Sequence, residues 1–120
     1  AVRPPWSVNA LALAALRAAA SRPEALAAAA VRASAERDDL VQRLARIAGI
    51  RIWPSSANFC LVEVPDGPRV TESLRASSIA VRPAASFPGL KSTHLRITAR
   101  EPAANARLAE ALGSAVAACP

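Results

Sequence analysis

The feature that most limits the fold of this chain is an alternation of apolar and polar side chains near its C-terminal end. In residues 95–100 (LRITAR) an apolar side chain stands at every second position, with arginine or threonine between. Successive side chains of a β-strand point to opposite faces of the sheet. The segment therefore predicts a strand that packs on a core with one face and presents Arg96 on the other.

A second short strand is predicted just before it. Residues 79–82 (IAVR) end in Arg82, and the connecting segment 83–94 carries serine, proline and glycine, which favour turns. Two guanidinium groups near one cleft suit a carboxylate or a phosphate, because each fork makes two parallel charge-assisted hydrogen bonds. The alternative is that both arginines are solvated surface residues. Spacing alone favours this alternative, because 14 of the 15 basic residues are arginine.

Capping signals predict two helices in the first part of the chain. Ser7 or Asn9 precedes an alanine-rich run and suits a helix N-cap. Ser21 and Glu24 have the spacing of a capping box, which predicts a long second helix that ends near Ile47.

Two adjacent aspartates in the second helix, Asp38 and Asp39, raise the question of a metal or an acid–base pair. Neighbouring helix residues do not share a face, so we interpret both as solvated. Asp39 and Arg43 are spaced for an i,i+4 ion pair in the favourable order.

The second half of the chain predicts strands and helices in a mixed order. The apolar run in residues 58–64 (NFCLVEV) predicts a central strand buried on both faces. Residues 50–53 alternate as a short strand, a Pro-Asp-Gly-Pro turn at 65–68 leads to a short helix, and Pro102 opens a last helix. The expected fold is a single α/β (α+β) domain over residues 1–120, with helices covering a small sheet.

The basic charge of the chain is spread along it. Fifteen basic residues against 9 acidic ones give a net charge of +6. Such a balance permits binding to nucleic acid or to a membrane surface, but those sites generally gather their basic residues in one patch. We therefore expect neither partner, and no apolar run is long enough to cross a membrane.

The cysteines and the histidine form no metal-binding pattern. Cys60 lies in an apolar run and is expected to be a buried free thiol, Cys119 lies near the C-terminus, and His94 has no partner motif. Unpaired cysteines are typical of a reducing compartment, and we expect no signal sequence. We expect a cytoplasmic protein without a metal site.

Five short motifs resemble one enzyme family. They are residues 4–9 (PPWSVN), 57–59 (ANF), 79–82 (IAVR), 87–90 (FPGL) and 95–98 (LRIT). Together they resemble the C-terminal part of pyridoxal-phosphate enzymes of the aspartate aminotransferase superfamily. Histidinol-phosphate aminotransferase and threonine-phosphate decarboxylase of cobalamin biosynthesis are the most similar members, and the FPGL loop favours the second.

The resemblance implies roles for three residues. Arg82 and Arg96 would bind the anionic groups of the substrate, and Asn58 would lie near the domain cleft as a further substrate-binding residue. A turn-capping role for Asn58 is an open alternative. Ser78 departs from the family pattern, which has glycine before the first arginine strand.

The resemblance also implies that catalysis needs groups outside this chain. The family forms a Schiff base between pyridoxal phosphate and a lysine. The only lysine here, Lys91, lies in the loop between the arginine strands rather than in the family's lysine motif. In the family the lysine, the aspartate at the pyridine nitrogen and the phosphate-binding loop belong to a large domain that precedes the small one.

We therefore expect residues 1–120 to be the C-terminal small, substrate-gripping domain, with the large cofactor-binding domain absent. The expected partners are that large domain, a small anionic amino-acid or amino-phosphate substrate, and a second subunit in a homodimer. The chain alone should hold no catalytic or cofactor-binding residue and be inactive. Transamination and decarboxylation stay open, and the alternative is a stand-alone basic binding module without catalysis.

Overall fold

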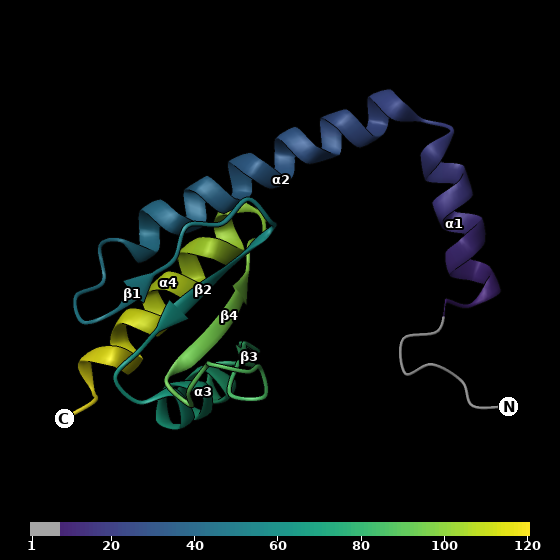
Figure 1. Ribbon diagram of the computed structural model, residues 1–120. Coiled ribbons are helices and arrows are strands. Elements are labelled where there is room, and N and C mark those ends of the chain that lie inside the picture. Colours follow the sequence, from purple (N-terminus) through teal and green to yellow (C-terminus); the bar gives the residue numbers. More distant parts are fainter. Residues whose placement is uncertain (1–7) are drawn as a thin grey trace, which may run out of the picture. The chain divides into compact units, whose positions relative to one another are not determined.

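The computed structural model describes residues 8–120, which form four helices and one four-stranded sheet (Figure 1). In chain order the elements are α1 (Ala10–Ala20), α2 (Pro23–Leu44), β1 (Arg51–Ile52), β2 (Phe59–Glu63), α3 (Gly67–Ala76), β3 (Arg82–Pro83), β4 (His94–Thr98) and α4 (Pro102–Ala117). This order confirms the predicted one. Predictions for residues 1–7, including a cap at Ser7, lie outside the described residues. Within residues 8–120 no helix combines the length and hydropathy that a bilayer crossing requires.

The chain divides into two compact units, residues 1–32 and 33–120. In the first unit the side chain of Asn9 caps α1, because its Oδ1 accepts a hydrogen bond from the Ala12 amide at 2.8 Å. The predicted capping box is wrong, because the Ser21 hydroxyl donates to the carbonyl of Ala18 and ends α1 instead. α2 begins two residues later at Pro23, where proline's missing N–H costs nothing.

The second unit holds the sheet, whose strands are antiparallel in the order β1-β2-β4-β3. Helices α2, α3 and α4 contribute side chains to a single core with one face of this sheet. The fully buried large side chains on that face and its helices are Leu40, Leu44, Val62, Val70, Leu74, Leu95, Ile97 and Leu112. The predicted α/β fold, with helices covering a small sheet, is thus confirmed.

Burial alternates along the central strand β2. Cys60 and Val62 are buried on the core face, whereas Phe59 and Leu61 are half-buried on the other. The predicted central position of this strand is confirmed, but its predicted burial on both faces is wrong. The reason is that the core helices pack on one side of the sheet. The Cys60 thiol is free as expected, and burial raises its pKa to about 11.

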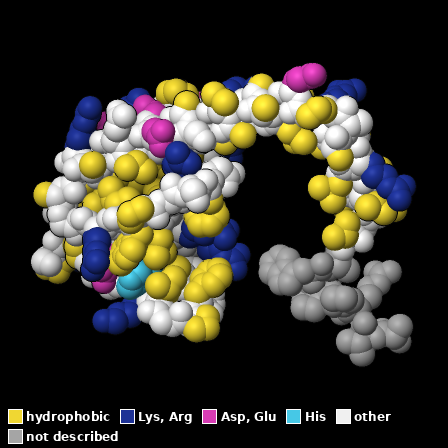
Figure 2. Space-filling model, turned by 45° about the horizontal axis from the view of Figure 1, so that its top comes forward, with side chains coloured by type: hydrophobic (Ala, Val, Ile, Leu, Met, Phe, Trp, Pro, Cys, Tyr) yellow, Lys and Arg dark blue, Asp and Glu magenta, His cyan; other side chains and the backbone are white. Residues whose placement is uncertain are grey.

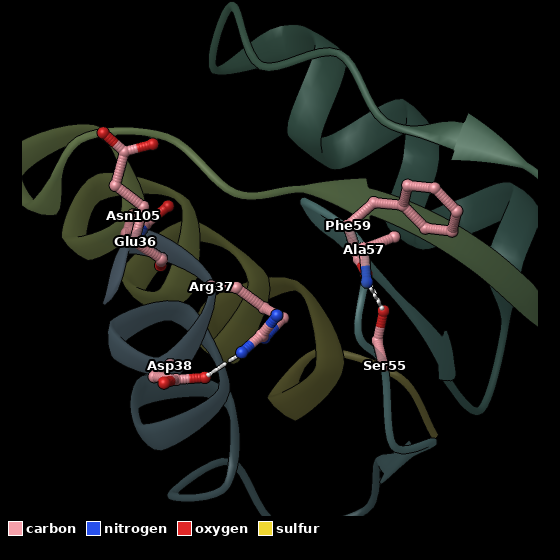
Figure 3. Close-up of polar contacts among 7 residues, drawn as sticks. All are labelled: Glu36, Arg37, Asp38, Ser55, Ala57, Phe59 and Asn105. Atoms are coloured by element: carbon pink, nitrogen blue, oxygen red, sulfur yellow. Dashed lines mark hydrogen bonds and ion pairs between the residues drawn. The ribbon is translucent and has the colours of Figure 1, made fainter. Parts of the chain in front are cut away.

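A buried amide joins α2 to the start of α4. Asn105 is 1% exposed, accepts a hydrogen bond from the Arg100 amide at 2.9 Å, and donates to the carbonyl of Glu36 at 2.8 Å (Figure 3). It also donates to Asp39, which the Arg43 guanidinium pairs at 2.9 Å as predicted. These hydrogen bonds lower the pKa of Asp39, and the bond from Arg43 has the largest effect. The interpretation of Asp39 as merely solvated is therefore wrong.

The N-terminus of α3 lies against the backbone that precedes β4. A Cβ built on Gly67 would lie 1.9 Å from the carbonyl oxygen of Ser92, so only glycine fits at this position. The Asp66 side chain caps the helix by accepting from the Arg69 amide at 3.0 Å. This approach holds α3 next to the start of β4.

The chain leaves α3 through a residue in the left-handed region. Ser78 has φ 58°, and the Ile79 amide donates to the carbonyl of Leu74 at 2.9 Å, which ends the helix. Glycine is the usual residue in this conformation. The predicted strand at residues 79–82 is wrong in its bounds, because β3 comprises Arg82 and Pro83 and residues 79–81 do not pair with β4.

Candidate anion-binding site

The sheet register places the two arginines of interest directly opposite each other. Arg82 of β3 pairs with Arg96 of β4, and on its other side Arg96 pairs with Leu61 of β2. Residues directly opposite on antiparallel strands share a face. We call this surface the arginine face, and it comprises Phe59, Leu61, Glu63, Arg82, His94, Arg96 and Thr98. It lies on the side of the sheet opposite the core helices.

Each arginine lies over an aromatic ring. The guanidinium carbon of Arg96 is 5.1 Å from the ring centroid of Phe59, and that of Arg82 is 5.9 Å from the centroid of Phe87. A cation over an aromatic face is attracted by the ring's quadrupole, and this contact also limits the directions that the long side chain takes. The rings therefore hold two cationic groups on one face of the sheet.

Neither guanidinium group has an anionic partner within residues 8–120. Among the ion pairs of residues 8–120 neither Arg82 nor Arg96 takes part, and the buried Nε of Arg96 has no hydrogen-bond partner within those residues. Like charges directly opposite on neighbouring strands destabilise a sheet. A buried donor without an acceptor also costs free energy. An anion bound at this position would relieve both costs.

A small pocket adjoins Arg96. Its volume is about 230 Å³, and it is lined by Phe59, Leu61, Ala84, Phe87, Leu90 and Arg96. The loop after β3 forms the outer wall of this pocket. Two turns shape the loop, because the Phe87 amide donates to the carbonyl of Ala84 and the Leu90 amide donates to the carbonyl of Phe87. Gly89 follows with φ 83°. The site thus combines one cationic group with an apolar wall.

The third predicted site residue lies elsewhere. Asn58 is exposed and directly precedes β2, and its carbonyl accepts a hydrogen bond from the Ala99 amide at 2.8 Å. It lies in the bend before the strand and is not part of the arginine face. The structure therefore brings Arg82 and Arg96 together and leaves Asn58 out of this group.

The single lysine and the histidine take structural positions near the loop. Lys91 is exposed, and its backbone amide donates to Nδ1 of His94 at 3.1 Å. The His94 ring is buried beneath Trp53, with ring centroids 5.3 Å apart. Within residues 8–120 no group of histidine, cysteine and carboxylate side chains is arranged to hold a metal ion.

Sequence reasoning missed Phe59 and Phe87 as parts of the site. Both occur in the motifs quoted above, but only the register shows that Phe59 shares a face with Arg96. On the face drawn in Figure 2, basic side chains (dark blue) are dispersed among apolar ones (yellow) and form no continuous block. Charge density therefore does not mark the site.

Together the one-sided antiparallel sheet and its helical cover define a small α/β domain. Residues 1–112 match the family model for class I and II aminotransferases, and the chain belongs to this family. The predicted resemblance is therefore confirmed.

Individual relatives agree with this assignment. The chain is 36% identical over 111 residues to histidinol-phosphate aminotransferase of Chromobacterium violaceum, covering 92% of this chain and 31% of that protein. It is similar to the crystal structure of L-threonine-O-3-phosphate decarboxylase from Porphyromonas gingivalis, with 27% identity, a TM-score of 0.75, and coverage of 92% of this chain and 35% of that one. A candidate aminotransferase from Burkholderia pseudomallei gives 36% identity and a TM-score of 0.76 over 91% of this chain and 34% of its own.

Proposed function

We propose that this chain is the small, substrate-gripping domain of a pyridoxal-phosphate-dependent enzyme, in which Arg82 and Arg96 bind the anionic groups of a small amino-acid or amino-phosphate substrate. The observation that carries the proposal is the cross-strand arginine pair with no anionic partner among the described residues. The chain spans 31% of the length of the Chromobacterium relative, which supports a missing large domain. A homodimer and a cytoplasmic location are part of this proposal.

The described residues do not fit the cofactor by themselves. Lys91 is exposed in a loop, and its backbone amide is bonded to His94. Binding pyridoxal phosphate is therefore assigned to the large domain in this proposal, and the cofactor supplies the electron sink for transamination or decarboxylation there. The role of this chain is to bind and orient the substrate's anionic group.

Histidinol phosphate and threonine phosphate are the two substrates suggested by the names of the relatives. Both carry a phosphate, which a guanidinium fork binds through two parallel hydrogen bonds. Only threonine phosphate as the substrate would assign the enzyme to cobalamin biosynthesis. A substrate-binding role for Asn58 stays a prediction, and a stand-alone basic binding module remains the alternative function.

The test joins this chain to the large domain of a histidinol-phosphate aminotransferase and compares kcat/KM for single variants. A hydrogen bond to a charged group contributes about 1.5–3 kcal/mol, so Arg96→Ala and Arg82→Ala should each lower kcat/KM roughly 10- to 100-fold. Arg96→Lys should recover only part of the loss, because a point charge does not reproduce the fork.

The matched control is Arg69→Ala, because Arg69 is exposed on α3 and joins no ion pair of the described residues. Arg107 is exposed on α4 but is a poorer control, since its Nη2 donates to the carbonyl of Ser77 at 2.7 Å. If Arg96→Ala behaves like Arg69→Ala, Arg96 is an ordinary surface residue and the proposal is wrong.

A further inference from the structure

We propose that a pocket beyond the end of β4, which Arg100 and Arg107 line, binds the phosphate group of a small phosphate monoester. Its residues are distinct from Arg82 and Arg96, which the proposed function assigns to the substrate. A second anion site of this kind goes beyond the proposed function and is tested separately from it.

The pocket lies where the pairing of β3 with β4 stops. Arg82 is opposite Arg96, so continuing the same register would place Ala80 opposite Thr98. No backbone hydrogen bond joins Ala80 to Thr98 within the described part of the chain. The left-handed turn at Ser78 (φ 58°) leads the chain into the sheet only at Arg82. Residues 78–80 and 98–100 therefore border an open space instead of extending the sheet.

A backbone amide of β4 faces this space. The His94 carbonyl accepts a hydrogen bond from the Ala84 amide on the β3 side, whereas the Ala99 amide donates to the carbonyl of Asn58 on the β2 side. Successive residues of an antiparallel strand direct their backbone groups to opposite neighbours. Thr98 therefore directs its amide toward the β3 side, as His94 directs its carbonyl. Because β3 does not extend this far, the Thr98 amide is available to a ligand.

Two guanidinium groups reach the pocket from different elements. Arg100 lies in the link between β4 and α4, and Arg107 lies in α4. Neither joins an ion pair of residues 8–120, and the carboxylates nearest in sequence, Glu101 and Glu110, do not line the pocket. Nη2 of Arg107 donates to the carbonyl of Ser77 at 2.7 Å, which holds this guanidinium next to the turn after α3. A guanidinium has five N–H donors, so most of them are left for a ligand.

The charges and the walls of the pocket indicate the class of ligand. Two cationic forks without a carboxylate favour a dianion, and phosphate oxygens accept two parallel hydrogen bonds from each fork. Ser78 and Thr98 add hydroxyl groups, and Ile79 and Leu108 add apolar surface. The volume of about 370 Å³ lies within the roughly 300–1,000 Å³ typical of small-molecule sites. There is thus space for a short carbon group, which would cover the apolar walls that inorganic phosphate leaves in contact with water.

The experiment titrates the 120-residue chain with inorganic phosphate, propyl phosphate and butyrate at low salt, because salt screens exposed charges. NMR follows the backbone amides of residues 78–80 and 98–108 for the pocket, and those of 82–84 and 94–96 for the arginine face. Propyl phosphate should shift the first set. Each methylene that the pocket buries should lower Kd up to roughly fourfold relative to inorganic phosphate. Butyrate, a monoanion with the same propyl group, should bind roughly tenfold more weakly than propyl phosphate.

A matched pair of variants in the first turn of α4 tests the location. Ala104 lines the pocket, whereas Ala103 is exposed and does not. Ala104→Glu places a carboxylate in the pocket and should raise the Kd of propyl phosphate roughly tenfold or more. Ala103→Glu adds the same charge outside the pocket and should raise it less than about threefold.

A second variant removes one of the guanidinium groups. Arg100→Gln should raise the Kd of propyl phosphate at the pocket roughly tenfold, and Arg69→Gln on α3 is its control. Arg96→Ala should leave the shifts of residues 78–80 and 98–108 unchanged. Far-UV circular dichroism of each variant verifies that the fold is retained.

The outcomes separate the second site from the proposed function. If propyl phosphate shifts only residues 82–84 and 94–96, the pocket is not a binding site and the proposed function is unaffected. If Ala104→Glu and Ala103→Glu raise Kd equally, the ligand responds to overall charge and the second site is wrong. If inorganic phosphate binds as tightly as propyl phosphate, the monoester assignment is wrong. If the pocket binds as expected but Arg82→Ala and Arg96→Ala leave kcat/KM of the joined enzyme unchanged, the second site stands and the proposed function fails.

Discussion

The two faces of the sheet are built from the same strands and differ in almost every other property. On the core face Cys60, Val62, Leu95 and Ile97 are at most 1% exposed and contact the helices. On the arginine face burial is mixed, from the buried His94 to the exposed Thr98. Arg82 and Arg96 are paired across the strands there without an anionic partner among the described residues.

The difference shows that one face of β4 contributes to stability and the other face to the candidate binding site. Successive side chains of β4 point to opposite faces of the sheet. On the core face, burial of an apolar side chain stabilises the fold. On the arginine face, the buried Nε of Arg96 has no hydrogen-bond partner among the described residues. A like-charge pair and a buried donor without an acceptor both reduce stability. The core face supplies the stability that makes these costs tolerable.

Neighbouring residues of β4 give the sharpest test of this comparison. Leu95→Ala should lower the free energy of unfolding by about 2–5 kcal/mol, because Leu95 is fully buried and its loss leaves a cavity. Arg96→Ala should change it by roughly 1 kcal/mol or less, since the loss of a cation–π contact is offset by relief of the like-charge pair and of the unpaired Nε. Urea denaturation of the 120-residue chain measures both. Equal losses for the two variants would show that the faces do not differ in this way.

Two asparagines extend the comparison to polar residues. Asn105→Ala should cost about 1–3 kcal/mol, because it leaves the Arg100 amide and the Glu36 carbonyl unpaired in a buried position. Asn58→Ala should stay within about 0.5 kcal/mol, because that side chain is exposed. Thermal denaturation followed by circular dichroism distinguishes them. A large loss at Asn58 would reveal a structural role for that side chain.

The turn that leads to β3 offers a gain in stability. Ser78 has φ 58°, a conformation that costs an L-residue about 1–2 kcal/mol and glycine little. Because glycine loses more conformational freedom on folding, Ser78→Gly should stabilise the chain by about 0.5–1 kcal/mol in net terms. Ser78→Ala, which keeps the Cβ, is the control and should give no such gain. Stabilisation by both variants would point to the hydroxyl rather than the backbone.

The smallest expected effect is a pH dependence at Asp39. The Arg43 and Asn105 hydrogen bonds lower its pKa below the ordinary value of 3.8. The folded state thus favours the charged carboxylate, and this contribution to stability is present above pH 3.8 and lost as pH falls through the folded-state pKa. The difference in unfolding free energy between wild type and Asp39→Asn should therefore be larger at pH 6 than at pH 2. Identical pH profiles for the two proteins would contradict the assignment.

Local sequence signals predicted the order of the elements and the orientation of β4. The alternation in residues 95–99 is a property of one strand, so the sequence alone shows that Leu95 and Arg96 point to opposite faces. The turn residues after Arg82 likewise indicated the loop. These features depend on neighbours in sequence, which is why they were accessible without a structure.

The strand register and the packing of helices on one side of the sheet could not be predicted from local sequence signals. The apolar run around Phe59 is equally compatible with burial on one face or on both, and only the position of the helices decides it. The contact between Phe59 and Arg96 depends on pairing across 37 residues of sequence, from 59 to 96. The short β3 also differs from its prediction, because the left-handed turn at Ser78 delays pairing until Arg82.

The close approach at Gly67 has a consequence for how this chain tolerates change. Every other amino acid carries a Cβ, which here would lie 1.9 Å from the carbonyl oxygen of Ser92 and clash with it. Every amino-acid substitution at this position should therefore destabilise the fold, whatever the chemistry of the new side chain. In a saturation library selected for folded protein, position 67 should retain glycine alone, whereas Gly89, with no atom within 4 Å of an added Cβ, should accept asparagine, which tolerates its positive φ.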